Sequence, residues 1–202
     1  MPKIVDKEQK RIEIARKAMP LVAKYGFANT PVRKITAEVG MGKGTFYDYF
    51  TNKEDILNEI IRITFADWTQ MVISKIGKID DPLEQLFIML KEGSNLDKTF
   101  EQMMIIYVDL WRWSVGHKGA DKFIPAFRTY LTNGKKAVSD IIEEAQQKGL
   151  IKKEVDSAAL ATALIALIDG MCMHYMILKP DFDVDAISRS FFESLSNGIK
   201  RT

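Results

Sequence analysis

The chain has 202 residues, enough for one large domain or two smaller ones, and its 47% hydrophobic content is ordinary for a soluble globular protein. A single cysteine, Cys172, excludes an intrachain disulfide, and two isolated histidines provide no metal-ligand cluster, so we expect no metal ion and no cofactor. Residues 1–55 hold 11 Lys/Arg against 7 Asp/Glu, whereas the remainder is slightly acidic, which points to a nucleic-acid contact confined to one end.

No segment has the features of an export signal. The N-terminal stretch MPKIVDKEQKRIEIARK lacks the apolar core of a signal peptide, and we therefore expect a cytoplasmic protein. The most apolar segment, residues 158–178, approaches the length of a membrane span but carries Asp169, His174 and several small residues. We interpret this segment as a buried helix.

The first predicted helix runs from about Lys7 to Tyr25, with a kink at Pro20 and a stop at Gly26. Its expected buried side consists of Ile12, Ala15, Met19, Val22 and Ala23. A second, very short helix begins after Thr30, whose hydroxyl is expected to act as the N-cap, and ends at Gly40.

A third short helix is predicted over 42–50, and Asn52 is expected to cap a long fourth helix that reaches about residue 76. Further helices are predicted at roughly 83–93, 98–115, 120–148, 156–178 and 184–199. The pattern predicts an all-α fold with two domains. A three-helix domain would occupy 1–55, and a larger helical bundle would occupy 56–202.

The glycine-rich stretch GMGKGTFYDYF, residues 40–50, has two possible uses. A nucleotide-binding P-loop would need glycine at position 37 and serine or threonine at 44, where the chain has alanine and glycine. A dinucleotide-binding loop would need glycine at 45, which is threonine, and both loops would need a preceding strand where VRKITAEV has helical spacing. The nucleotide interpretation fails on both residues and context.

The alternative is a helix-turn-helix motif at about 31–50, in which two short helices are joined by a tight turn, and this would make 1–55 a DNA-binding domain. Phe46 and Phe50, four residues apart, would pack on the second helix, leaving Gly44 and Asp48 on the opposite face. Gly44 would let the backbone approach DNA closely, and the hydroxyls of Thr45 and Tyr47 can donate to phosphates. Lys43 at the helix N-terminus and Lys53 beyond it would add positive charge near the phosphates.

Residues 30–57 resemble the helix-turn-helix of the TetR/AcrR family of transcriptional regulators. The positions that match the family pattern are Thr30, Ile35, Gly40, Gly44, Thr45, Phe46, Tyr47, Tyr49, Phe50, Lys53 and Leu57. The chain departs from the pattern at Thr36 and Val39, where alanine is usual, and at Gly42, where a capping serine is common. The motif covers about a seventh of the chain but is specific.

The resemblance implies roles for individual residues. Arg33 and the start of the third helix would read bases, while Thr45, Tyr47, Tyr49 and Lys53 would hold the phosphate backbone. Asp48 either accepts a hydrogen bond from cytosine or faces water. The basic residues of the first helix are interpreted as a solvated face, with Lys3 and Lys7 also able to form an arm that reaches DNA; the helix carries Lys7, Lys10, Arg11, Arg16 and Lys17.

Residues 56–202 are rich in methionine and aromatic side chains, which suit either a bundle core or a pocket for an apolar or aromatic ligand. Regulators of this family bind their effectors in this second domain. The residues we expect to line the pocket are Met103, Tyr107, Trp111, Phe127 and His174. For each of them a place in the core, or for His174 a structural hydrogen bond, is the simpler alternative.

The resemblance also implies a homodimer formed through the last two helices, about 156–178 and 184–199. The first of these has a stripe of small residues, and Ile187, Phe191, Leu195 and Ile199 recur every four residues on the second. Two recognition helices related by a two-fold axis would read a palindromic operator in double-stranded DNA. The alternative is that both faces are buried within one monomer.

The sequence therefore predicts a homodimeric, ligand-responsive transcriptional regulator, most simply a repressor released by a small apolar or aromatic effector. Effector binding would favour a different separation of the recognition helices, with the long fourth helix as lever. An enzyme is the first rival, but we find no activated nucleophile, metal cluster or catalytic carboxylate pair. An adaptor that binds only protein is the second rival, and it leaves Lys43, Thr45, Tyr47 and Lys53 without a role.

Overall fold

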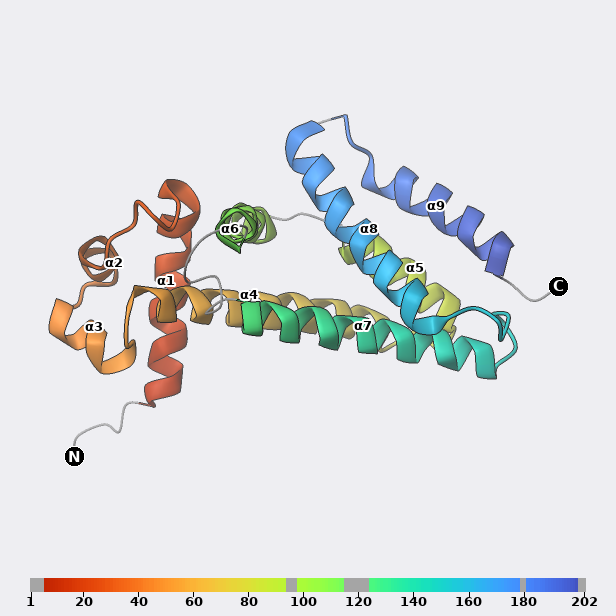
Figure 1. Ribbon diagram of the computed structural model, residues 1–202, viewed down its shortest axis with the longest axis horizontal. Helices are drawn as coiled ribbons and strands as arrows, with labels where there is room; N and C mark the ends of the chain where they lie inside the picture. Colours follow the sequence, from red (N-terminus) through yellow and green to blue (C-terminus); the bar gives the residue numbers. More distant parts are fainter. Residues whose placement is uncertain (1–5, 94–97, 115–123, 179–180, 200–202) are drawn as a thin grey trace. The chain divides into compact units, whose positions relative to one another are not determined.

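The structure, a computed structural model, describes residues 6–93, 98–114, 124–178 and 181–199, with the backbone alone at 98–100, 110–114 and 124–127. Within these residues the chain is helical, as predicted, and the helices are labelled in Figure 1: α1 (Lys7–Tyr25), α2 (Val32–Val39), α3 (Lys43–Tyr49), α4 (Lys53–Ile76), α5 (Pro82–Gly93), α6 (Lys98–Ser114), α7 (Ile124–Gln147), α8 (Ser157–Leu178) and α9 (Val184–Ile199). The predicted boundaries that fall on described residues are within about two residues of these, and the predicted start of α7 near 120 lies outside the described residues.

The chain divides into two compact units. Residues 1–67 and 98–128 form the first unit, and residues 68–97 and 129–202 form the second, so α4 and α7 contribute to both. The first unit therefore contains α6 in addition to the three-helix region and the start of α4. The functional boundary between 55 and 56 remains a prediction.

The core of the first unit is built on one face of α1. Its buried residues are Ile14, Ala15, Ala18, Met19 and Val22, whereas Ile12 and Ala23, which were expected there, are half-exposed. The side chain of Asp6 accepts hydrogen bonds from the amides of Glu8 and Gln9 and so caps the start of the helix. Pro20 lies on the exposed side, within the continuous helical run.

The prediction that Thr30 caps α2 is wrong. Its hydroxyl donates to the carbonyl of Gly26 at 2.8 Å, and its side chain is buried. Pro31 occupies the N-cap position instead, in an extended conformation without a side-chain cap. The Gly26 carbonyl follows the end of α1, where the last carbonyls of a helix have no partner within it. The Thr30 hydroxyl therefore stabilises the corner between α1 and α2 rather than the start of α2.

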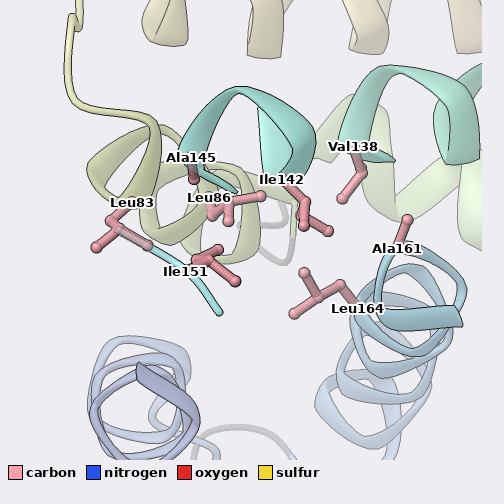
Figure 2. Close-up of a cluster of buried hydrophobic side chains, with 8 residues drawn as sticks. All are labelled: Leu83, Leu86, Val138, Ile142, Ala145, Ile151, Ala161 and Leu164. Atoms are coloured by element: carbon pink, nitrogen blue, oxygen red, sulfur yellow. The ribbon is translucent and has the colours of Figure 1, made fainter. Parts of the chain in front are cut away.

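The second unit has its own core between α5, α7 and α8 (Figure 2). The buried side chains in this cluster are Leu83, Leu86, Val138, Ile142, Ala145, Ile151, Ala161 and Leu164. The apolar residues of α9 that were expected at a dimer interface partly cover this same cluster: Phe191, Leu195 and Ile199 are half-buried against it. Apolar spacing on α9 is therefore explained at least in part within one chain.

Helix α8 is the one helix among the described residues that is long and apolar enough to cross a membrane by length and composition. Only 28% of its most apolar window is buried, so the prediction of a buried helix is correct for one face alone. That face carries Ala161, Leu164, Ile168, Met171 and Cys172. Burial raises the pKa of the Cys172 thiol to about 12, so this sulfur stays protonated and is not an activated nucleophile.

Candidate nucleic-acid interface and apolar pocket

Helix α3 has one buried and one exposed side. It begins after Gly42, and its ring pair Phe46 and Phe50 is fully buried, with centroids 5.2 Å apart. Of the residues predicted to contact DNA, five lie on the exposed side of α3: Lys43, Gly44, Thr45, Tyr47 and Asp48. The burial of the two rings thus fixes which side of this short helix faces solvent.

The exposed side of α3 allows a close approach of another molecule. A Cβ atom added at Gly44 would meet no atom within 4 Å, so the backbone there is open to solvent. The Tyr47 ring packs edge-on against Phe46 with the ring centroids 5.4 Å apart, while 48% of the Tyr47 surface stays exposed. Arg33 on α2 is exposed, whereas Tyr49 is half-buried.

Arg11 fixes α3 from the neighbouring helix, and its assignment to a solvated face is wrong. The guanidinium donates to the carbonyl of Tyr49, pairs with Asp55 at 3.0 Å and Glu59 at 3.2 Å, and lies 4.5 Å from the ring centroid of Phe50. Desolvation lowers its pKa, but the hydrogen bonds and charges of the two carboxylates outweigh this and leave the pKa raised. The remaining basic side chains of α1 fit the solvated description better, and Arg16 and Lys17 are exposed.

Lys53 at the start of α4 is engaged within the protein. Its ammonium donates to the carbonyl of Phe27 at 2.5 Å and to that of Ala28 at 3.3 Å, and lies 4.3 Å from the Phe27 ring centroid. Burial lowers its pKa, partly offset by the nearby Glu54. As predicted, the Asn52 side chain caps α4 by accepting from the amide of Asp55 at 2.8 Å.

A small apolar pocket lies between α4 and α6 in the first unit. Its lining consists of Ile60, Ile61, Thr64, Phe65, Met103, Ile106 and Tyr107, of which Met103 and Tyr107 were expected to line a pocket. The one hydroxyl from α4, on Thr64, already donates to the carbonyl of Ile60 at 2.6 Å. The lining carries no charged group, so it suits a hydrocarbon surface.

The other expected lining residues do not extend this pocket. The side chains of Trp111 and Phe127 lie outside the described residues. His174 lies in the second unit, on an exposed face of α8, where its Nδ1 is 2.7 Å from the carbonyl of Gly170 and its ring stacks on Phe182. Among the described residues no group of three potential metal ligands comes together.

One contact in this unit was not anticipated from the sequence. The Asp109 carboxylate on α6 accepts a hydrogen bond from the amide of Phe27 at 3.3 Å, across 82 residues of sequence. The sequence did show Asp109 as a single acidic residue within an apolar run of α6, but nothing in the sequence indicated its partner.

The sequence matches known protein families and individual proteins. Residues 14–60 match the family described as bacterial regulatory proteins of the tetR family, and residues 120–196 match the C-terminal region of BetI-type transcriptional repressors. The fatty acid metabolism regulator protein of Bacillus subtilis (strain 168) is 25% identical over 194 residues, 96% of this chain and 97% of that protein. The regulator PksA of the same organism is 23% identical, over 98% of this chain and 93% of that protein.

Solved structures share the fold over nearly the whole chain. A transcriptional regulator from Saccharomonospora viridis in complex with choline has a TM-score of 0.80 and 22% identity, covering 96% of this chain and 99% of that one. FadR from Bacillus subtilis in complex with stearoyl-CoA has a TM-score of 0.77 and 22% identity, covering 93% and 98%. The sequence relatives are transcriptional regulators rather than enzymes. The chain belongs to the TetR family of DNA-binding, ligand-binding transcriptional regulators.

Proposed function

We propose that the protein is a cytoplasmic, homodimeric repressor that leaves a palindromic operator when an apolar effector occupies its ligand-binding region. The observation that carries the proposal is the two-sided character of α3. Burial of Phe46 and Phe50 leaves Lys43, Thr45 and Tyr47 exposed on a helix whose exposed Gly44 presents bare backbone.

On DNA, α3 would enter the major groove. Arg33 and the start of α3 near Gly44 would contact base edges, while Lys43, Thr45 and Tyr47 would contact phosphates. Tyr49 and Lys53 would support this surface from its edge, since the first is half-buried and the second already holds two carbonyls. Asp48 would accept from a cytosine amino group or remain in water.

The exposed face of α8 supports the dimer. Ala163, Ala166, Gly170, Met173 and Ile177 follow one another at intervals of three and four residues, the spacing of a helix–helix seam. Ile177 is 76% exposed, and a Cβ at Gly170 would meet no atom within 4 Å. A second copy of the same helix across a two-fold axis would cover this face. Support from α9 is weaker because its apolar residues already pack within the chain.

A hydrocarbon chain is the effector class that the described pocket favours. Six of the seven lining residues are isoleucine, methionine or aromatic, the seventh is Thr64, and none is charged. A quaternary ammonium such as choline would call for several aromatic faces around one point. The relatives named for fatty acid metabolism and for a stearoyl-CoA complex agree with an acyl chain.

Selection from a library of random duplex DNA at two salt concentrations tests the DNA-binding part. We expect enrichment of a palindrome and an affinity that falls steeply as salt rises, because Lys43 and its neighbours displace counterions from phosphates. Enrichment of an asymmetric site would contradict the dimeric operator. Absence of any enriched sequence would contradict specific reading by α3.

Release of the selected duplex tests the effector part. Stearoyl-CoA and choline are added separately to the protein–DNA complex, and release is followed by fluorescence anisotropy. We expect release by stearoyl-CoA and none by choline. Release by choline alone would overturn the acyl-chain assignment, and tighter binding with stearoyl-CoA would overturn the role as a ligand-released repressor.

A further inference from the structure

The Phe27 peptide group at the end of α1 is held from two sides. Its N–H donates to Asp109 on α6 at 3.3 Å, and its carbonyl accepts from Lys53 on α4 at 2.5 Å. The Phe27 side chain is only 4% exposed and lies under the Lys53 ammonium. This one residue therefore connects α1 with both helices that line the apolar pocket.

Gly26 makes the close contact with Asp109 possible. Its φ of +76° lies in the region that residues with a side chain rarely adopt, and a Cβ there would lie 3.2 Å from the Asp109 Oδ2 atom. The Gly26 carbonyl also accepts the Thr30 hydroxyl at the entrance to α2. A displacement of this corner, residues 26–30, would therefore move the start of the helix-turn-helix.

On the other side, Asp109 is close to the pocket along α6. Ile106 and Tyr107, which line the pocket, precede it by three and two residues. A helix moves as a rigid element over so short a distance, so a shift of α6 at Ile106 carries the Asp109 carboxylate with it. Among the described residues, the Phe27 amide is the hydrogen-bond partner found for this carboxylate.

We propose that Asp109 is a positioning residue that couples the α4–α6 pocket to the helix-turn-helix through the Phe27 amide. With the pocket collapsed, the carboxylate holds the α1–α2 corner in place. A ligand that parts α6 from α4 withdraws the acceptor and frees the corner. The effect of a pocket ligand on DNA binding rests on the effector role proposed above. Coupling between two sites is reciprocal, so the effect of DNA on the pocket can be measured with DNA alone.

The test is hydrogen–deuterium exchange on the full-length protein with and without the duplex selected as described above. Four proteins are compared: wild type, Asp109→Ala, Asp109→Asn and the neighbouring control Val108→Ala, whose side chain is partly exposed. We expect the duplex to slow exchange in residues 103–107 of wild type and of Val108→Ala. Asp109→Ala should lose most of this effect, and Asp109→Asn, whose amide oxygen can still accept, should retain it.

The Phe27 amide supplies a second readout that requires no ligand. Its exchange should be roughly fivefold faster or more in Asp109→Ala than in Asp109→Asn, because only the alanine variant lacks the acceptor. If Asp109→Ala does not fold, Asp109→Ser takes its place, since its side chain is too short to reach Phe27. Equal DNA-induced protection of 103–107 in the wild type and in the variant without the acceptor would overturn the proposal.

Failure of the effector role would look different. If neither stearoyl-CoA nor choline releases the duplex while the duplex still protects 103–107 through Asp109, the effector assignment is wrong and the coupling through Asp109 stands. If the duplex does not protect 103–107 in wild type, the coupling itself is refuted, whatever the effector does.

Discussion

The guanidinium of Arg11 donates to the main-chain carbonyl of Tyr49, which lies 38 residues further along the chain at the end of α3. The last carbonyls of a helix have no partner within it, so Arg11 acts as a C-terminal cap supplied by another helix. The same side chain pairs with Asp55 and Glu59 at the start of α4. One residue of α1 thus sets the position of α3 relative to α4.

Replacement of Arg11 should lower both stability and operator affinity. We expect Arg11→Ala to lower the free energy of unfolding by about 1–3 kcal/mol. The Arg11 side chain is only 20% exposed, and its removal leaves its polar partners unsatisfied. Arg11→Lys should recover little, since an ammonium lacks the planar fork that reaches several acceptors. The matched control is Arg16→Ala, which breaks an exposed pair with Asp67 and should cost at most about 1 kcal/mol. Equal losses in urea unfolding would refute the special role of Arg11.

The Arg11 network should also make stability depend on pH. Burial raises the pKa of Asp55, but the hydrogen bonds from Arg11 and the Thr51 amide outweigh it and leave the pKa lowered. A carboxyl with a lowered folded pKa contributes stability above its unfolded pKa of about 3.9 and loses it as pH falls through the folded pKa. Asp55→Asn should therefore be less stable than wild type near neutral pH, and the gap should close below about pH 4. A gap that is constant from pH 3 to 7 in urea titrations would contradict this.

Replacement of two lysines, at the start of α3 and at the start of α4, should have different effects. Lys43 is exposed, so Lys43→Ala should weaken operator binding and reduce the salt slope by about one without changing the urea midpoint. Lys53 holds the carbonyls of Phe27 and Ala28, so Lys53→Ala should lower the urea midpoint as well as operator affinity. An unchanged urea midpoint in Lys53→Ala would mean that its internal contacts contribute nothing.

The helices and the exposed side of α3 were predictable because their signals are local. Asn52 caps α4 from three residues away, Gly40 ends α2 in a left-handed conformation, and the spacing of Phe46 and Phe50 fixes a buried side. The roles of Arg11 and Asp109 depend on partners 38 and 82 residues distant. No periodicity or cap pattern in a single sequence identifies such partners, and an arginine on a charged helix looks the same whether it is solvated or paired.

Two glycines with positive φ test the close approach of Asp109. Gly26 and Gly40 have φ values of +76° and +73° but ψ values of 153° and 39°, and only at Gly26 would a Cβ meet a neighbouring atom. Gly40→Ala should cost about 1–2 kcal/mol for the left-handed backbone alone. Gly26→Ala should cost more, both because its ψ lies in a region that is essentially restricted to glycine and because its Cβ crowds the Asp109 carboxylate. Urea unfolding of both variants, alone and combined with Asp109→Ala, gives the comparison. The excess cost at Gly26 should shrink in the Asp109→Ala background by the part that is due to crowding. An excess that is unchanged there would mean that the backbone conformation of Gly26 accounts for all of it.

A charge on the exposed face of α8 should disrupt the proposed dimer. Ala166 is exposed in the single chain, so Ala166→Glu should leave the monomer folded while placing a carboxylate in an apolar seam between two copies. The control is Asn133→Glu, which adds the same charge to an exposed site on α7. Sedimentation velocity should give a dimer for wild type and the control and a monomer for Ala166→Glu, with operator affinity falling in parallel because one recognition helix reads only half a palindrome. If Ala166→Glu is still a dimer, the interface does not lie at this seam. If the wild type is a monomer, the proposed dimer is wrong, and two independent chains would have to read the palindrome.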